Sequence, residues 1–132
     1  MKIIVTERIA DEGVNYLRNC GFAVDTRYGI SHPELLEIIE HYDAIIVRSV
    51  TKVNKELIEK GVNLKVAGRA GNGIDNIDVP ACTKKGIIVV NTPESNTMAA
   101  AELAIGLAYA IFRNIPQAHW AGKNKDFRRN KY

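Results

Sequence analysis

The residues best suited to bind a ligand lie in one glycine-rich stretch, GRAGNGIDNID, at positions 68–78. Its three glycines permit positive φ angles and leave the backbone open to close approach by a ligand. Successive backbone N–H groups in such a turn can form a concave anion site, and Arg69 supplies a guanidinium beside it. The stretch therefore predicts a site for a small anionic group; the alternative is a purely structural turn before a helix.

A dinucleotide-binding fingerprint is the main rival interpretation of this stretch, because Gly71 and Gly73 follow a predicted strand. The third glycine of the pattern G-x-G-x-x-G would fall at position 76, which is occupied by asparagine. The spacing therefore argues against a nucleotide-binding loop here.

Chain length and composition indicate an ordinary globular protein. The chain has 132 residues, of which 46% are hydrophobic and 25% charged, so it is long enough to bury a real core. Its net charge of +3 comes from residues 123–132, which hold five basic residues and one acid, whereas the rest of the chain has 13 basic and 14 acidic residues. A short basic tail is typical of a solvated segment, so we expect no nucleic-acid partner.

Cysteine and histidine usage argues against several other kinds of site. Cys20 and Cys82 lie far apart without metal-ligand spacing, and the three histidines, at positions 32, 41 and 119, form no ligand pattern. We therefore expect no bound metal. The sequence shows no leader peptide, which favours a reduced, cytoplasmic setting with both thiols buried and inert.

Apolar, β-branched segments alternate with short amphipathic segments along the first 95 residues, which indicates an α/β fold. The predicted strands cover residues 1–6, 22–26, 44–47, 64–67 and 87–90, and the predicted helices cover residues 10–19, 32–41, 55–60 and 79–85. Ser31, Asn54 and Asp78 are the expected helix caps. The alternation predicts a parallel, flavodoxin-like sheet of order 2-1-3-4-5, covered by helices on both faces.

This fold also predicts where a ligand would bind, because open α/β sheets bind ligands beyond the carboxyl ends of their strands. Strands three and four would be neighbours, so Arg48 and Arg69 should arrive close together at one edge, with Ser49 beside them. Two arginines, a hydroxyl and a nest of amides describe a pocket for a small polyanion. Arg48 also stands where a phosphoacceptor domain needs an aspartate, which argues against that class.

Residues 97–112, TMAAAELAIGLAYAIF, predict a strong helix with Asn96 as its cap. The helix carries one charge, Glu102, and is apolar nearly all round, so most of its surface should be buried. It is shorter than the roughly 20 residues needed to span a bilayer, so we expect no membrane insertion. Residues 114–132 have too few apolar side chains to cover it, and we therefore expect a homo-oligomer in which this helix is the interface.

Four segments carry a resemblance to a known family. They are VRSVTKV at 47–53, GRAGNGIDNID at 68–78, KKGIIVVNTPESN at 84–96 and AAAEL at 99–103. In this order and spacing they resemble the amino-terminal part of the D-isomer-specific 2-hydroxyacid dehydrogenases, and the likeness covers essentially the whole chain. It implies that residues 1–95 form a substrate-binding domain. Residues 96–132 would then hold a crossover helix and a basic tail that lead to a nucleotide-binding domain absent from this chain.

The resemblance also implies roles for individual residues. The implied substrate-binding residues are Arg48, Ser49, Arg69, Ala70, Gly71 and Asn96, and Asn72 would contact the NAD cofactor at a position where relatives often carry threonine. The substrate implied is a small phosphorylated hydroxy acid, 3-phosphoglycerate, oxidised with NAD in serine biosynthesis. The family's nucleotide fingerprint and its catalytic arginine, glutamate and histidine would lie beyond Tyr132, so we expect the 132 residues to be inactive alone. The alternative is a stand-alone flavodoxin-like module that binds or senses a small anionic metabolite.

Overall fold

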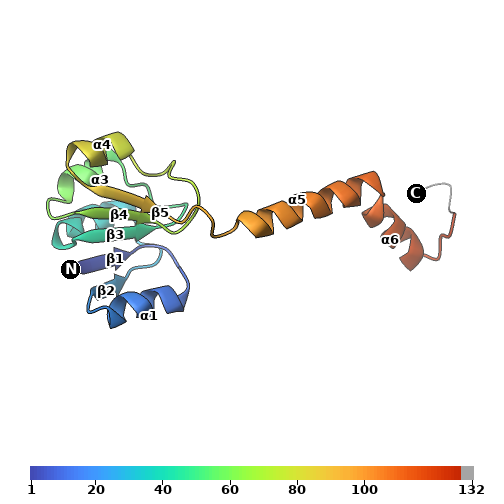
Figure 1. Cartoon of the computed structure of the whole chain (residues 1–132), viewed down its shortest axis with the longest axis horizontal. Helices are drawn as coiled ribbons and strands as arrows, with labels where there is room; N and C mark the ends of the chain where they lie inside the picture. The colour runs from blue at the N-terminus through green and yellow to red at the C-terminus, as the bar shows by residue number, and fades with distance from the viewer. Residues whose placement is uncertain (129–132) are drawn as a thin grey trace. The chain divides into compact units, whose positions relative to one another are not determined.

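The structure is a computed structural model that describes residues 1–128, and it divides into a unit of Met1–Ser95 and a second unit that begins at Asn96. Two basic residues of the predicted solvated tail, at positions 129 and 131, lie outside the described residues. In the first unit, five parallel strands form one sheet of order β2-β1-β3-β4-β5 (Figure 1). The strands are β1 (Lys2–Val5), β2 (Ala23–Thr26), β3 (Ala44–Val47), β4 (Val66–Arg69) and β5 (Ile88–Asn91). The predicted fold class and strand order are confirmed.

Three of the four helices of the first unit begin at the capping residues that the sequence indicates, and α1 (Asp11–Asn19) begins after Ala10 without a side-chain cap. The others are α2 (His32–Ile38), α3 (Lys55–Lys60) and α4 (Val79–Lys84), and a 3₁₀ turn (Ile39–His41) follows α2. Ser31 and Glu34 form a reciprocal capping box, and the side chains of Asn54 and Asp78 each accept a backbone N–H three residues on, at 3.0 Å. The helix predicted over 32–41 is thus α-helical only to Ile38, and its last turn is tighter.

Strand β4 begins two residues later than predicted, at Val66 instead of Leu64. Leu64 belongs to the turn after α3, where its N–H donates to the Gly61 carbonyl at 3.1 Å and its side chain is buried. The strand also ends later than predicted, at Arg69, which pairs in register with Val47 of β3. Arg69 is the last residue of a strand and not the first of a loop, which fixes the face of the sheet on which its side chain lies.

Two apolar clusters cover the two faces of the sheet. One packs α2, α3 and α4 against the face that carries Ile4, Ile45 and Ala67. The other packs α1 against the face that carries Val5 and Ala44. Helices therefore lie on both faces, as predicted, but the side chains of β5 on the α1 face stay open: Ile88 is 62% and Val90 47% exposed.

The two thiols lie in different environments, which corrects the expectation that both are buried. Cys82 of α4 is fully buried, and burial together with the charge of Asp78 raises the pKa of its thiol. Cys20 is exposed. It lies just past the end of α1, where the chain turns through Gly21 (φ 85°) toward β2 and away from the apolar stripe of the helix.

The second unit consists of helices α5 (Thr97–Phe112) and α6 (Ile115–Lys123). The bounds of α5 are as predicted, and none of its residues is buried. The expected cap is wrong among the described contacts: Asn96 offers no side-chain hydrogen bond to the helix, and only its backbone carbonyl accepts, from Ala100 N–H at 2.9 Å. Helix α6 was not predicted; it begins after Asn114, whose left-handed backbone (φ 47°) turns the chain sharply.

Within residues 1–128, no single helix is both long and apolar enough to cross a membrane. Helices α5 and α6 meet that test of length and composition only when taken together, as a pair bent by 63°.

Candidate functional site

The carboxyl ends of β1, β3 and β4 come together at one edge of the sheet and carry most of the predicted site residues. β3 pairs with both of the other strands, so the segments that follow all three are adjacent. Arg48 and Ser49 follow β3, and Arg69 ends β4. The structure thus brings these three residues to the same edge, as the strand order predicts.

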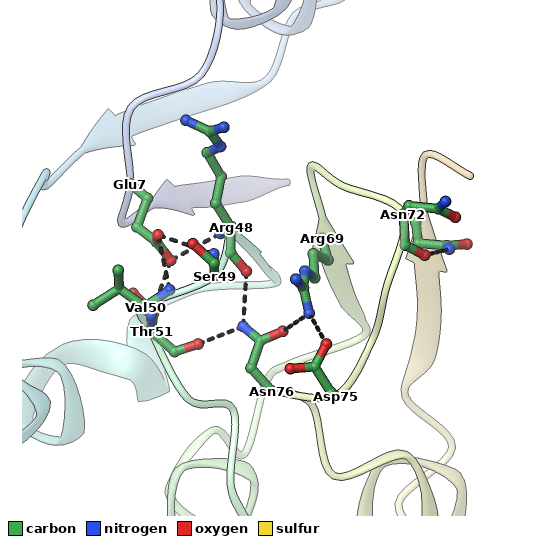
Figure 2. Close-up of polar contacts among 10 residues, drawn as sticks. Glu7, Arg48, Ser49, Val50, Thr51, Arg69, Asn72, Asp75 and Asn76 are labelled. Atoms are coloured by element: carbon green, nitrogen blue, oxygen red, sulfur yellow. Dashed lines mark hydrogen bonds and ion pairs between the residues drawn. The ribbon is translucent and has the colours of Figure 1, made fainter. Parts of the chain in front are cut away.

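Arg48 and Arg69 nevertheless do not converge on one point. Arg69 pairs in register with Val47, so Arg48 lies one residue further along its strand direction. Because side chains alternate between the faces of a sheet, the two guanidinium groups leave on opposite sides. Figure 2 shows Arg48 and Arg69 pointing away from each other. The predicted single pocket between two arginines is therefore corrected to one arginine on each side of the sheet edge.

The guanidinium of Arg69 is held by two neighbours from the glycine-rich stretch. Its Nη1 donates to the Asp75 carboxylate and, at 2.7 Å, to Oδ1 of Asn76 (Figure 2). The Arg69 side chain is only 14% exposed, whereas the Asp75 side chain is 83% exposed. The hydrogen bond from Arg69 lowers the pKa of the Asp75 carboxyl below its usual value.

Asn76 connects Arg69 to the segment that follows β3. Its Nδ2 donates to the backbone carbonyls of Arg48 at 2.8 Å and Thr51 at 2.6 Å, while its Oδ1 accepts from Arg69. One amide side chain therefore fixes the ends of two neighbouring strands relative to each other. Asparagine suits this position because its side chain offers both donors and an acceptor.

Glu7 organises the same segment from the end of β1, a role that the sequence did not reveal. Its carboxylate accepts four consecutive backbone N–H groups, from Arg48 (2.8 Å), Ser49 (3.1 Å), Val50 (3.0 Å) and Thr51 (2.9 Å). An acid directly after a buried strand was the only available signal. The bonds join residues more than 40 positions apart, which local patterns do not report.

The pKa of the Glu7 carboxyl reflects two opposed effects. Partial burial raises the pKa, but the hydrogen bonds from the backbone of Thr51, Arg48 and Val50 together outweigh it, so the pKa lies below its usual value of 4.5. A lowered folded-state pKa means that the carboxylate contributes stability above about pH 4.5 and loses that contribution as the pH falls through the folded-state value.

We expect Glu7→Gln to lower the free energy of unfolding at pH 7 by about 1–2 kcal/mol, since a neutral amide replaces a charged acceptor at a partly exposed position. Urea unfolding between pH 7 and pH 3 measures this. The gap between wild type and variant should narrow as the pH falls, because the wild-type carboxyl then becomes neutral as well. Glu12→Gln, at an exposed position on α1, is the control. Parallel stability profiles for wild type and Glu7→Gln would contradict the role assigned to Glu7.

The glycine-rich loop is tied down by its own backbone. The N–H of Ala70 donates to Val47 at 2.9 Å and that of Gly71 to the Arg69 carbonyl at 2.9 Å. The amides predicted to hold a carboxylate are thus already engaged, and an anion would have to share or replace these bonds. Beyond them, Asn91 Nδ2 donates to the carbonyl of Asn72 at 2.6 Å, which leaves the exposed Asn72 side chain at the surface of the loop.

Two of the hollows along the sheet edge have several polar lining residues. The first, of about 450 Å³, is lined by Arg48 together with Arg8, Ala70, Thr92 and Ser95, and Arg48 Nη1 donates to the Arg8 carbonyl at 3.2 Å. The second, of about 470 Å³, is lined by Ser49 together with Lys52, Asn54, Asp75 and Asn76. Arg8 is a lining cation that the sequence did not single out. The remaining predicted residue, Asn96, belongs to the second unit.

Comparison with known proteins shows which protein family the chain resembles. The family model described as D-isomer specific 2-hydroxyacid dehydrogenase, catalytic domain, matches residues 3–127. Among curated relatives, D-3-phosphoglycerate dehydrogenase of Archaeoglobus fulgidus is 46% identical over the whole chain, which covers 25% of that protein. A chloroplastic D-3-phosphoglycerate dehydrogenase of Arabidopsis thaliana is 47% identical over 99% of the chain, which covers 21% of that protein. This chain therefore spans about a quarter of the length of the curated relatives it matches.

Solved structures agree with that result. The PH0520 protein of Pyrococcus horikoshii superposes with a TM-score of 0.83 at 30% identity, over 96% of this chain and 38% of that one. An NAD+-bound 3-phosphoglycerate dehydrogenase of Entamoeba histolytica superposes with a TM-score of 0.74 at 37% identity, over 86% of this chain and 39% of that one. With a family model that matches nearly the whole chain, we conclude that the chain belongs to the D-isomer specific 2-hydroxyacid dehydrogenase family.

Proposed function

We propose that this chain is the substrate-binding part of an NAD-dependent dehydrogenase that oxidises 3-phosphoglycerate to 3-phosphohydroxypyruvate. The observation that carries the proposal is the arginine pair at the carboxyl edge of the sheet, Arg48 and Arg69, in a chain 46% identical to a D-3-phosphoglycerate dehydrogenase. The acid carries two anionic groups, a phosphate and a carboxylate, and guanidinium is the side-chain group that binds either through paired hydrogen bonds.

In this proposal the residues of the chain bind and orient the acid. Arg48 acts in the first hollow, which Ala70 also lines, whereas Ser49 lies in the second hollow, next to the Asp75 and Asn76 that hold Arg69. The amides of Ala70 and Gly71 would contact the acid by sharing or replacing their present bonds. Hydride transfer itself belongs to NAD, which supplies the acceptor when it is bound by a complete enzyme. The NAD-bound relative supports NAD as that cofactor.

The described residues do not fit NAD by themselves. The glycine-rich loop follows β4 at the middle of the chain, and Asn76 stands where the dinucleotide fingerprint needs its third glycine. Asn72 is the one residue with an expected cofactor contact. We therefore propose that a nucleotide-binding domain completes the enzyme, and that the 132 residues alone bind the acid weakly without turnover.

The purified 132-residue chain, labelled with ¹⁵N and titrated with 3-phosphoglycerate, tests this proposal. Chemical-shift changes are expected at Arg48, Arg69 and Gly71, with a weaker response to D-lactate, which lacks the phosphate. No NADH should form with 3-phosphoglycerate and NAD. NADH formation would show that the chain is active by itself. Unchanged spectra would show that the chain does not bind the acid, and shifts confined to other residues would place the site elsewhere.

The same titration separates the alternative, a stand-alone module that senses an anionic metabolite. A sensor of the end product would respond to serine, on a surface remote from the sheet edge, and would ignore 3-phosphoglycerate. The dehydrogenase proposal expects the opposite pattern.

A further inference from the structure

Arg69 has one edge of its guanidinium occupied and the other available. Nη1 carries two hydrogens, and Asp75 and Asn76 accept one each. Among residues 1–128 the structure gives no hydrogen bond donated by Nε or Nη2 of Arg69. These two nitrogens form the planar pair that binds a carboxylate or phosphate through two parallel bonds. The side chain is therefore held at one end while its bidentate edge remains for a ligand.

The position of the glycine-rich loop supports this arrangement. A Cβ built on Gly71 would lie 3.5 Å from Nε of Arg69, so the available edge lies beside the loop backbone. A Cβ built on Gly73 would lie 2.8 Å from Oδ1 of Asp75, which is closer than a Cβ approaches another heavy atom in folded proteins. The lack of a side chain at Gly73 is what allows the Asp75 carboxylate to reach Nη1.

We propose that Asp75 and Asn76 are positioning residues, which hold Arg69 with its Nε–Nη2 edge turned toward the glycine-rich loop, ready for the anion. The inference rests on the proposed function, since it takes Arg69 as an anion-binding residue. A long side chain fixed before binding loses less conformational entropy when the ligand arrives.

The negative charge of Asp75 also bears on the anion, and it acts in the opposite direction. Asp75 could compete with the ligand for Arg69 or repel it. Its side chain is 83% exposed, so water and salt screen that repulsion strongly. Asn76 is neutral and holds the same nitrogen from a second side, so the orientation of Arg69 does not depend on charge alone. The positioning effect should therefore prevail.

The test uses Asp75→Ala and Asp75→Asn in the 132-residue chain, with 3-phosphoglycerate as the probe. Asp75→Ala should raise the Kd about three- to tenfold, the range expected when one long side chain must be ordered on binding. Asp75→Asn keeps an acceptor oxygen and should fall between wild type and Asp75→Ala. The Nε–H resonance of Arg69 should broaden in Asp75→Ala before ligand is added. Glu59→Gln removes another exposed, ion-paired carboxylate, on α3, and is the matched control.

A double variant separates this inference from the proposed function. On an Arg69→Ala background, Asp75→Ala should change the Kd no further, because there is no guanidinium left to position. If Asp75→Ala binds the probe as tightly as wild type or more tightly, Asp75 is a bystander or a competitor and the inference is overturned. If Arg69→Ala itself leaves the Kd unchanged, Arg69 does not bind the anion and the proposed site is wrong. The inference then fails because there is no anion-binding arginine to position, whatever Asp75 does.

A second route to the same contact is Gly73→Ala. The added methyl would displace the Asp75 carboxylate while every charge is retained. The Kd should rise by a similar factor to that of Asp75→Ala. An unchanged Kd and an unchanged Arg69 Nε–H resonance would show that the Asp75 contact does not matter for binding.

Discussion

Replacing Arg69 with alanine should raise the Kd for 3-phosphoglycerate at least about tenfold. A charge-assisted contact contributes roughly 1.5–3 kcal/mol, and 1.4 kcal/mol corresponds to one decade in affinity. In a full-length protein carrying this sequence, the same loss should appear as a higher KM while the affinity for NAD stays unchanged. Chemical-shift titration of the chain and steady-state kinetics of the full-length protein measure the two effects.

Arg48→Ala should weaken binding to a similar degree and independently of Arg69. The two side chains leave opposite sides of the sheet edge and, within residues 1–128, share no hydrogen-bond partner, so the losses in the double variant should add. Lys60→Ala is the control, because Lys60 ends α3 just before the chain turns into β4, at the opposite end of the sheet. If both arginine variants bind 3-phosphoglycerate as tightly as the wild type, the binding site does not lie at this edge of the sheet.

Much of the fold follows from short-range patterns in the sequence. Caps such as Ser31 and Asp78 mark the helix starts, and the alternation of strand and helix leads to the observed strand order. These features depend on residues close together in the chain. The end of the α2 segment and the start of β4 were misjudged, because Leu64 is apolar and buried yet lies in a turn.

The candidate site was predicted less completely, because its geometry depends on register. The pairing of Arg69 with Val47, one residue before Arg48, decides on which side of the sheet each guanidinium lies. The contacts of Glu7 and Asn76 connect segments from three different strand ends. Periodicity along one segment contains no information about such contacts, whereas the types of the residues at the edge could be read directly.

Helix α5 should make the 132-residue chain a dimer or a higher oligomer. Its large apolar side chains are all more than half exposed: Met98, Leu103, Ile105, Leu107, Tyr109, Ile111 and Phe112. Each such side chain left in water forgoes about 1.5–3 kcal/mol of burial. Three of them together approach the whole stability of a small domain, about 5–15 kcal/mol. Two copies that pack their α5 helices about a twofold axis would bury this surface.

Glutamate substitutions should break that assembly. Ile105 and Ile111 lie six positions apart, about 120° around the helix, so the two variants probe different faces of α5. A carboxylate forced into an apolar interface should weaken association at least about a hundredfold, or roughly 2.7 kcal/mol. We expect this loss in the variant whose substituted residue lies on the buried face of α5. Sedimentation velocity at micromolar concentration measures the change. Val62→Glu, at an exposed apolar position in the first unit, should leave the assembly intact. A monomeric wild type in which α5 remains helical would show that exposed apolar surface on this helix does not drive association.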